Sequence, residues 1–94
     1  MLTHELKTWP EYFEAVWNNN KTFEVRKQDR AYNVGDTLHL KEFYYTTQKY
    51  SGREIKVKVT YMLMGGQFGV DEDFCVMGFN RVYVSDVPFH EQDF

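Results

Sequence analysis

The stretch Arg53-Glu54-Ile55-Lys56-Val57-Lys58-Val59-Thr60-Tyr61-Met62 alternates between polar and apolar side chains from Glu54 to Tyr61. Successive side chains of a β-strand point to opposite faces, so this pattern predicts a long strand with the apolar set on a buried face. A Ser51-Gly52 turn just before it predicts a hairpin with the aromatic segment that precedes the turn. The centre of the chain is therefore predicted to be an antiparallel sheet.

Two segments on the N-terminal side show the same alternation. In Leu2–Lys7 the pattern predicts a short strand with His4 and Leu6 on one face. In Thr22–Arg26 it predicts a strand whose buried face carries the two apolar residues, while Glu24 and Arg26 project together from the other face.

Two further strands follow the same reasoning. The turn residues Asn33-Val34-Gly35-Asp36 precede an alternating segment, Thr37–Phe43, in which Leu38 and Leu40 point inward. After a glycine-rich loop near residues 65–69, Phe74–Val84 returns as a last strand or pair of strands.

One helix is predicted near the N-terminus. Thr8-Trp9-Pro10-Glu11 resembles a helix start, with Thr8 as the capping residue and Glu11 at the capping-box position three residues later. The helix is expected to end near Asn19, in a run of three asparagines. Trp9 and Trp17 belong to an aromatic stripe at helical spacing, and we assign both to packing.

These elements predict an α+β fold, in which a small curled antiparallel sheet or partial barrel is capped by the N-terminal helix. Apolar residues make up 43% of the 94 residues, enough for one compact core. We predict a single domain over residues 1–86 and an acidic tail over residues 87–94.

The lone Cys75 excludes an internal disulfide framework and fits a reducing compartment, so a cytoplasmic location with no membrane association is expected.

The charge is divided unevenly along the chain. The net charge is −3, but the segment from Lys21 to Lys58 holds nine basic and five acidic residues. If the fold gathers this segment on one face, it forms a positive patch suited to phosphates. The alternative is a strand-rich middle that uses lysine and arginine on its solvated faces.

The densest polar cluster begins where the helix is followed by a strand. It comprises Lys21, Glu24, Arg26, Lys27, Asp29 and Arg30. One interpretation is recognition, in which Lys21 and Arg26 bind phosphate or base edges and Glu24 accepts from an exocyclic amino group. Another is catalysis, with Lys21 as base or nucleophile and Glu24 as proton shuttle. In a third interpretation these residues only form a ladder of ion pairs on the protein surface.

The run Asn19-Asn20-Lys21-Thr22-Phe23-Glu24-Val25-Arg26 resembles the ASCH-domain signature, a Gly-x-Lys-x-x-Glu-x-Arg pattern between a first helix and the next strand. Asn19 stands where the pattern has glycine, and asparagine tolerates the left-handed conformation better than most residues. From His4 to about Val84 the chain is similar to a small ASCH-related family of bacterial and phage proteins of unassigned function, often labelled RNA-binding.

The resemblance implies a PUA-like β-barrel, a cleft lined by the signature, an RNA or nucleoside ligand, and no cofactor. Some ASCH relatives are amidohydrolases that act on N4-acetylcytidine, with a lysine at the position of Lys21 and a threonine where this chain has Glu24. We therefore predict a binding module. An amidohydrolase, with a later acid supplied by Asp71, Glu72 or Asp73, and a protein–protein interaction module remain the alternatives, and the sequence leaves the oligomeric state open.

Secondary candidates complete the predicted site. His4 and Lys7 belong to the family pattern near the cleft. Tyr44 and Tyr45 lie among basic residues in the hairpin, which suits a platform for single-stranded nucleic acid. The three histidines and Cys75 have no metal-ligand spacing, so no metal is assigned.

Overall fold

The computed structural model describes residues 1–85 of the chain. Its elements, in chain order, are β1 (Thr3–Thr8), α1 (Pro10–Trp17), β2 (Phe23–Lys27), β3 (Thr37–Tyr44), β4 (Lys49–Met64) and β5 (Phe74–Val84). The acidic tail predicted over residues 87–94 lies outside the described residues. Within residues 1–85 no helix is both long enough and apolar enough to cross a membrane.

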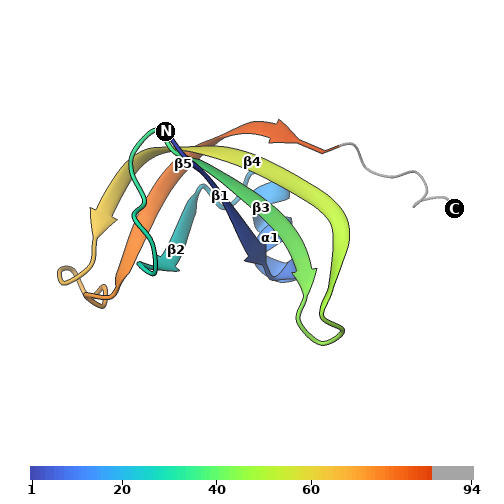
Figure 1. The fold of residues 1–94 in the computed structure, drawn as a ribbon, viewed down its shortest axis with the longest axis horizontal. Helices are drawn as coiled ribbons and strands as arrows, with labels where there is room; N and C mark the ends of the chain where they lie inside the picture. Colours follow the sequence, from blue (N-terminus) through green and yellow to red (C-terminus); the bar gives the residue numbers. More distant parts are fainter. Residues whose placement is uncertain (86–94) are drawn as a thin grey trace, which may run out of the picture.

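All five strands form one sheet in the order β1-β3-β4-β5-β2. β1 pairs with β3 in parallel, which differs from the antiparallel sheet predicted from the sequence, and the other neighbours are antiparallel. The pairing of β4 with β5 shifts register twice, and that of β3 with β4 shifts once. Such irregularities bend a strand and increase its twist, so the sheet curls into a half-barrel (Figure 1). β1 and β2 are the two free edges of this half-barrel.

The core lies on the concave face of the sheet. Its strand residues are Leu6, Leu38, Leu40, Ile55, Val57, Val59, Cys75, Met77 and Phe79. In β4 the predicted alternation holds through Val59, but Tyr61, predicted on the buried face, is exposed because the register with β5 shifts between Val59 and Tyr61. Phe13 and Val16 of α1 are buried in the same cluster, and Trp17 packs against it. The predicted α+β class, with a curled sheet and one short helix, is therefore observed.

The helix start differs from the prediction. α1 begins at Pro10, its N-cap is Trp9, and no side chain caps it. Thr8 is instead the last residue of β1, where its buried hydroxyl donates to the carbonyl of Leu6, 3.3 Å away. The strand runs directly into the helix, which leaves Thr8 one residue too early to cap. The helix also ends at Trp17, two residues before the predicted end.

Two predictions about strands are wrong in detail. The hairpin turn falls at residues 45–48, and Ser51-Gly52 lies inside β4. In β2 the alternation is present with its faces exchanged, because Phe23 and Val25 are exposed and Glu24 is only 4% exposed. β2 therefore turns a charged residue toward the interior.

Buried acids outside β2 are paired with cations or hydrogen-bond donors. Asp36 accepts from His4 at 2.8 Å and from the amides of Leu2 and Asn33. Burial acts to raise the pKa of Asp36, but these hydrogen bonds outweigh it and hold the pKa below its ordinary value. The remaining buried acid, Glu42, accepts two hydrogen bonds from Arg53.

Arg53 connects the sheet to the helix. Besides Glu42, its guanidinium donates to Glu14 of α1 at 2.9 Å. It also lies over the rings of Phe13 and Trp17, with centroids 5.2 and 4.7 Å from Cζ. The hydrogen bonds that Arg53 donates to Glu42 raise the pKa of its guanidinium above the ordinary value. One side chain thus fixes α1 against β3 and β4.

Candidate functional site

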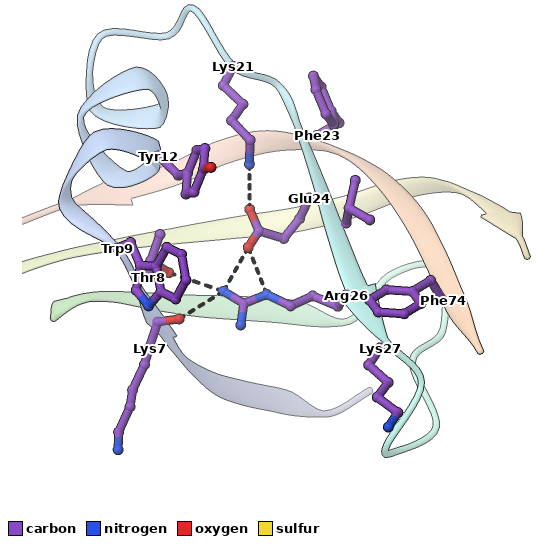
Figure 2. Close-up of a pocket in the computed structure, with 11 residues that line it drawn as sticks. Lys7, Thr8, Trp9, Tyr12, Lys21, Phe23, Glu24, Arg26, Lys27 and Phe74 are labelled. Atoms are coloured by element: carbon purple, nitrogen blue, oxygen red, sulfur yellow. Dashed lines mark hydrogen bonds and ion pairs between the residues drawn. The ribbon is translucent and has the colours of Figure 1, made fainter. Parts of the chain in front are cut away.

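A pocket of about 660 Å³ opens between the two free edges of the half-barrel. The end of β1 and the first turn of α1 form one wall, and β2 forms the other (Figure 2). Lys21 lies at the entrance to β2, and Phe74 of β5 completes the lining. We call this the candidate pocket. It contains all three residues of the predicted Lys-Glu-Arg constellation.

Glu24 is the centre of the polar contacts in the candidate pocket. Its Oε1 accepts from Nζ of Lys21 at 2.8 Å, and its Oε2 accepts from Nε of Arg26 at 2.8 Å. The Glu24 side chain is 6% exposed, against 18% for Lys21 and 24% for Arg26. Each carboxylate oxygen can accept more than one hydrogen bond. Glu24 therefore lies at the base of the pocket, oriented by two cations, with acceptor capacity left.

Arg26 also joins the two edges of the half-barrel. Its Nη2 donates to the backbone carbonyl of Lys7 at 3.0 Å and to the hydroxyl of Thr8 at 3.3 Å. In β1 the carbonyl of Leu2 bonds to Thr37 of β3, so by alternation the carbonyls of odd-numbered residues face the free edge. Lys7 offers one of these carbonyls, and Arg26 supplies the donor it lacks.

The chain leaving α1 brings Lys21 back toward Glu24. Asn19 has φ 63°, in the left-handed region, and the amides of Asn20 and Lys21 both donate to the carbonyl of Ala15. Asparagine is among the few residues other than glycine that adopt this conformation readily. The residue that departs from the glycine of the ASCH pattern thus adopts the backbone conformation that glycine would supply.

Aromatic rings surround the polar centre. Trp9, Tyr12 and Phe23 line the pocket, and each is between 45% and 50% exposed. Trp9 is stacked beside Tyr12 with ring centroids 6.2 Å apart and an interplanar angle of 25°, and its centroid lies 4.8 Å from that of Tyr45. The ammonium of Lys21 lies 5.2 Å from the centroid of Phe23. These exposed rings offer flat surfaces beside charged groups.

Of the six other predicted site residues, the candidate pocket includes two. Lys7 and Lys27 line the candidate pocket, and Lys7 directs its side chain away from Glu24 (Figure 2). Arg30 lies outside the candidate pocket, in a smaller pocket next to it. Tyr45 reaches the site only through its contact with Trp9. Tyr44 is exposed at the end of β3 and does not line the pocket.

His4 lies elsewhere. It is buried on the concave face, bonded to Asp36 and 4.7 Å from the ring centroid of Tyr32. Its role in the described structure is to satisfy a buried carboxylate. β1 therefore contributes Lys7 and Thr8 to the candidate pocket, whereas its His4 is buried away from the pocket.

The sequence did not identify Trp9, Tyr12, Phe23 or Thr8 as parts of the site. Trp9 was assigned to packing, and it is 48% exposed instead. Its orientation follows from β1, where His4, Leu6 and Thr8 face inward and the next residue must face outward. Extending the strand alternation by one residue could have found it.

Other chemistry-bearing groups are outside the pocket. Cys75 is fully buried, and burial raises the pKa of its thiol. Asp71, Glu72 and Asp73 are exposed in the loop between β4 and β5, and none of them lines the candidate pocket. Among residues 1–85 no three histidine, cysteine, aspartate or glutamate side chains converge as a metal site would require.

Comparison with known proteins places the chain in a family. It is 39% identical over 57 residues to the "Uncharacterized 12.9 kDa protein in GpA 3'region" of Escherichia phage P2. That alignment covers 61% of this chain and 50% of the phage protein, so the chain spans about half the length of its curated relative. Residues 3–79 match the family described as "Domain of unknown function (DUF3850)". This match includes the whole candidate pocket, and the protein belongs to the DUF3850 family.

Proposed function

We propose that this protein is an RNA-binding module that holds one unpaired base in the candidate pocket. The observation that carries the proposal is the buried Glu24 carboxylate, fixed between Lys21 and Arg26 at the base of an aromatic-lined pocket. Acceptor and donor groups that are held side by side at fixed positions suit the edge of a nucleobase, which presents donors and acceptors in one plane.

The aromatic lining supports binding of a base. Single-stranded nucleic acids are bound by stacking their bases on aromatic side chains, and each stacked base contributes about 1–3 kcal/mol. Trp9 and Tyr12 expose about half of their surface at the pocket. A base placed on Trp9 would cover this surface.

Charge at the rim supports a phosphate-bearing ligand. Lys7 and Lys27 line the same pocket and form no ion pair with the residues that the structure describes. Lysines act as point charges toward phosphate and supply affinity with little sequence information. The net acidic charge of the protein then limits binding to this region.

Glu24 gives the pocket a preference among bases. A carboxylate accepts hydrogen bonds and donates none, so it favours bases with an exocyclic amino group, such as cytosine or adenine, over uracil. The donors Lys21 and Arg26 on either side can reach the ring nitrogen or carbonyl of the same base. Guanine also has an amino group, but the ring nitrogen beside it carries a proton, whereas cytosine and adenine offer an acceptor nitrogen there for Lys21 or Arg26. We therefore propose cytosine or adenine as the bound base.

The proposal includes the ASCH-type, PUA-like relationship suggested by the signature. Lys21, Glu24 and Arg26 converge in one pocket, and Asn19 adopts the left-handed conformation expected at the glycine position. Both observations fit the cleft that the resemblance implies. The amidohydrolase alternative is less well supported, since Glu24 replaces the threonine of those enzymes and the candidate later acids do not line the pocket.

Fluorescence anisotropy with a labelled single-stranded ribonucleotide tests the proposal. We expect Trp9→Ala to weaken binding by about fivefold to a hundredfold, the equivalent of one lost stacking contact. Lys21→Ala should also weaken binding. The matched controls are Tyr83→Ala and Lys58→Ala, which remove an exposed ring and an exposed cation outside the pocket and should leave affinity unchanged.

Equal affinities of the Trp9 and control variants, or no binding by the wild type, would contradict the proposal. Release of acetate from N4-acetylcytidine that ends with Lys21→Ala would favour the hydrolase instead. Capture of a protein partner that depends on Tyr44 and is indifferent to Lys21 would favour an interaction module.

A further inference from the structure

We infer that the smaller pocket beside the candidate pocket is a phosphate subsite, so that the protein's ligand is a phosphorylated nucleotide unit rather than a free nucleoside. This inference rests on the proposed function, because the phosphate is taken to belong to the same ligand as the bound base. We call the smaller pocket the basic pocket. Its volume is about 290 Å³.

The basic pocket gathers four cations from four segments of the chain. Lys7 comes from β1, Arg26 from β2, Arg30 from the segment after β2, and Lys41 from β3. The single acid in its lining is Glu5, which is well exposed. Arg26 is already paired with the buried Glu24, so three further cations surround the Glu5 carboxylate. An excess of positive charge in a concave site concentrates anions.

The other three cations of the basic pocket are poorly neutralised by the protein itself. Nζ of Lys41 lies 4.0 Å from Glu5, at the limit of an ion pair, and Arg30 pairs only with its exposed neighbour Asp29 at 3.2 Å. Lys7 has no ion-pair partner among residues 1–85. An anion in the pocket would supply the missing negative charge.

The register of β1 with β3 is a second reason to expect an anion in the basic pocket. Lys7 and Lys41 are directly opposite each other in the parallel pairing of β1 with β3. Neighbouring like charges on one face of a sheet destabilise it. Lys7 and Lys41 therefore repel each other at the basic pocket. A phosphate bound between the two ammonium groups would reduce this repulsion.

Arg26 and Lys7 connect the two pockets, since both residues line each of them. The Nε and Nη2 groups of Arg26 bond to Glu24, Lys7 and Thr8, whereas Nη1 makes no hydrogen bond to any residue between 1 and 85. A guanidinium is suited to phosphate because its donors lie in a fixed plane. Arg26 can therefore hold Glu24 for the base and offer a free donor to the adjoining phosphate.

The test compares cytidine with its two monophosphates, which differ from it only in phosphate, and with a short oligonucleotide that contains phosphodiesters. Titration calorimetry would measure cytidine, cytidine 5′-monophosphate, cytidine 3′-monophosphate and a cytidine hexaribonucleotide at one salt concentration. We expect a monophosphate to bind about tenfold more tightly than cytidine, as one charge-assisted contact implies. Tighter binding of one monophosphate identifies a terminal phosphate, and tighter binding of the hexaribonucleotide alone identifies a phosphodiester.

One variant isolates the basic pocket. Lys41→Gln changes a residue that lines the basic pocket alone, and Lys58→Gln, at an exposed position that lines neither pocket, is its matched control. Lys41→Gln should remove most of the advantage of the phosphorylated ligand and leave cytidine binding unchanged. Arg30→Gln should act in the same direction, and thermal unfolding of each variant checks that the fold is retained.

The outcomes distinguish the two proposals. Equal binding of cytidine and all its phosphorylated forms, with no effect of Lys41→Gln, overturns the phosphate subsite and leaves the base pocket intact. Absence of binding by every ligand, including the hexaribonucleotide, overturns both. Competition by inorganic phosphate against the monophosphates but not against cytidine supports the subsite.

Discussion

The guanidinium of Arg26 crosses the open side of the half-barrel and donates to the backbone carbonyl of Lys7, 3.0 Å away. Arg26 belongs to β2 and Lys7 to β1, the two strands at opposite edges of one sheet. The same guanidinium bonds to Glu24. One side chain thus holds the edges together and orients the carboxylate at the base of the pocket.

Replacing Arg26 with lysine keeps the charge but removes the planar set of donors. We expect Arg26→Lys to lower the free energy of unfolding by about 1–3 kcal/mol, because hydrogen bonds to charged groups are lost and the edges separate. Urea denaturation measures the change. Lys27→Ala, at an exposed neighbouring position, serves as the control. An unchanged midpoint for Arg26→Lys would show that the bridge does not support the fold.

Glu24 should decide which base is preferred. The wild type is expected to bind a cytidine hexaribonucleotide about fivefold or more tightly than the uridine equivalent, since one base contact contributes about 1–3 kcal/mol of discrimination. Glu24→Gln replaces an acceptor oxygen with a donor amide, so this preference should disappear. Competition binding with the two oligonucleotides measures the ratio. A ratio unaffected by Glu24→Gln would place base recognition elsewhere.

Arg53 should be the most important cation for stability. Its loss leaves Glu42, whose side chain is 3% exposed, as a buried charge without a cation. We expect Arg53→Met to lower the free energy of unfolding by about 3–5 kcal/mol. Thermal or chemical denaturation measures the loss. The double variant Arg53→Met with Glu42→Leu should recover much of it, and a double variant as unstable as the single one would argue against an unpaired charge as the cause.

Asp36 should make the fold sensitive to acid. Its pKa is lower in the folded state than in the unfolded chain, so the folded state binds fewer protons. The stability it contributes is present above the unfolded pKa, near 4, and is lost as the pH falls through the folded pKa. Asp36→Asn should be less stable at neutral pH and should lose less on acidification.

The measurement is the free energy of unfolding of both proteins between neutral pH and about pH 2. Some acid sensitivity should remain in Asp36→Asn, because a hydrogen bond from Arg53 also lowers the pKa of Glu14. Parallel pH profiles for the two proteins would show that the hydrogen bonds of Asp36 do not favour its ionised form.

Cys75 should be unreactive in the folded protein. Its side chain is fully buried, and burial raises the pKa of the thiol, so little thiolate is available. A thiol reagent should react with the native protein only as fast as it unfolds, and rapidly in denaturant. Fast labelling of the native state would mean that β5 opens readily.

Much of the fold follows from local pattern. The alternation in Arg53–Met62 identifies β4, and the same rule locates the other strands to within a few residues. The pairing of β1 with β3 in parallel, and the position of β2 at the far edge, depend on contacts between distant segments. Periodicity carries no information about those contacts.

In the candidate site, too, some features follow from the local sequence and others depend on contacts between distant residues. The spacing of Lys21, Glu24 and Arg26 is short enough for the sequence to predict that they meet, and they do. The inward face of β2 was predicted wrongly, because apolar residues normally take the buried side. Glu24 is buried because Lys21 and Arg26 neutralise it, and Arg26 finds further partners 18 and 19 positions earlier in the chain.

The central claim, that the pocket between the two sheet edges holds an RNA base, is tested most directly by nuclear magnetic resonance. Two-dimensional amide spectra of the labelled protein, recorded during titration with a cytidine hexaribonucleotide, report on every residue of the domain at once. The account predicts that shifts concentrate at Trp9, Lys21, Glu24 and Arg26, including the indole signal of Trp9. Shifts confined to other surfaces, or a spectrum unchanged at saturating oligonucleotide, would contradict it.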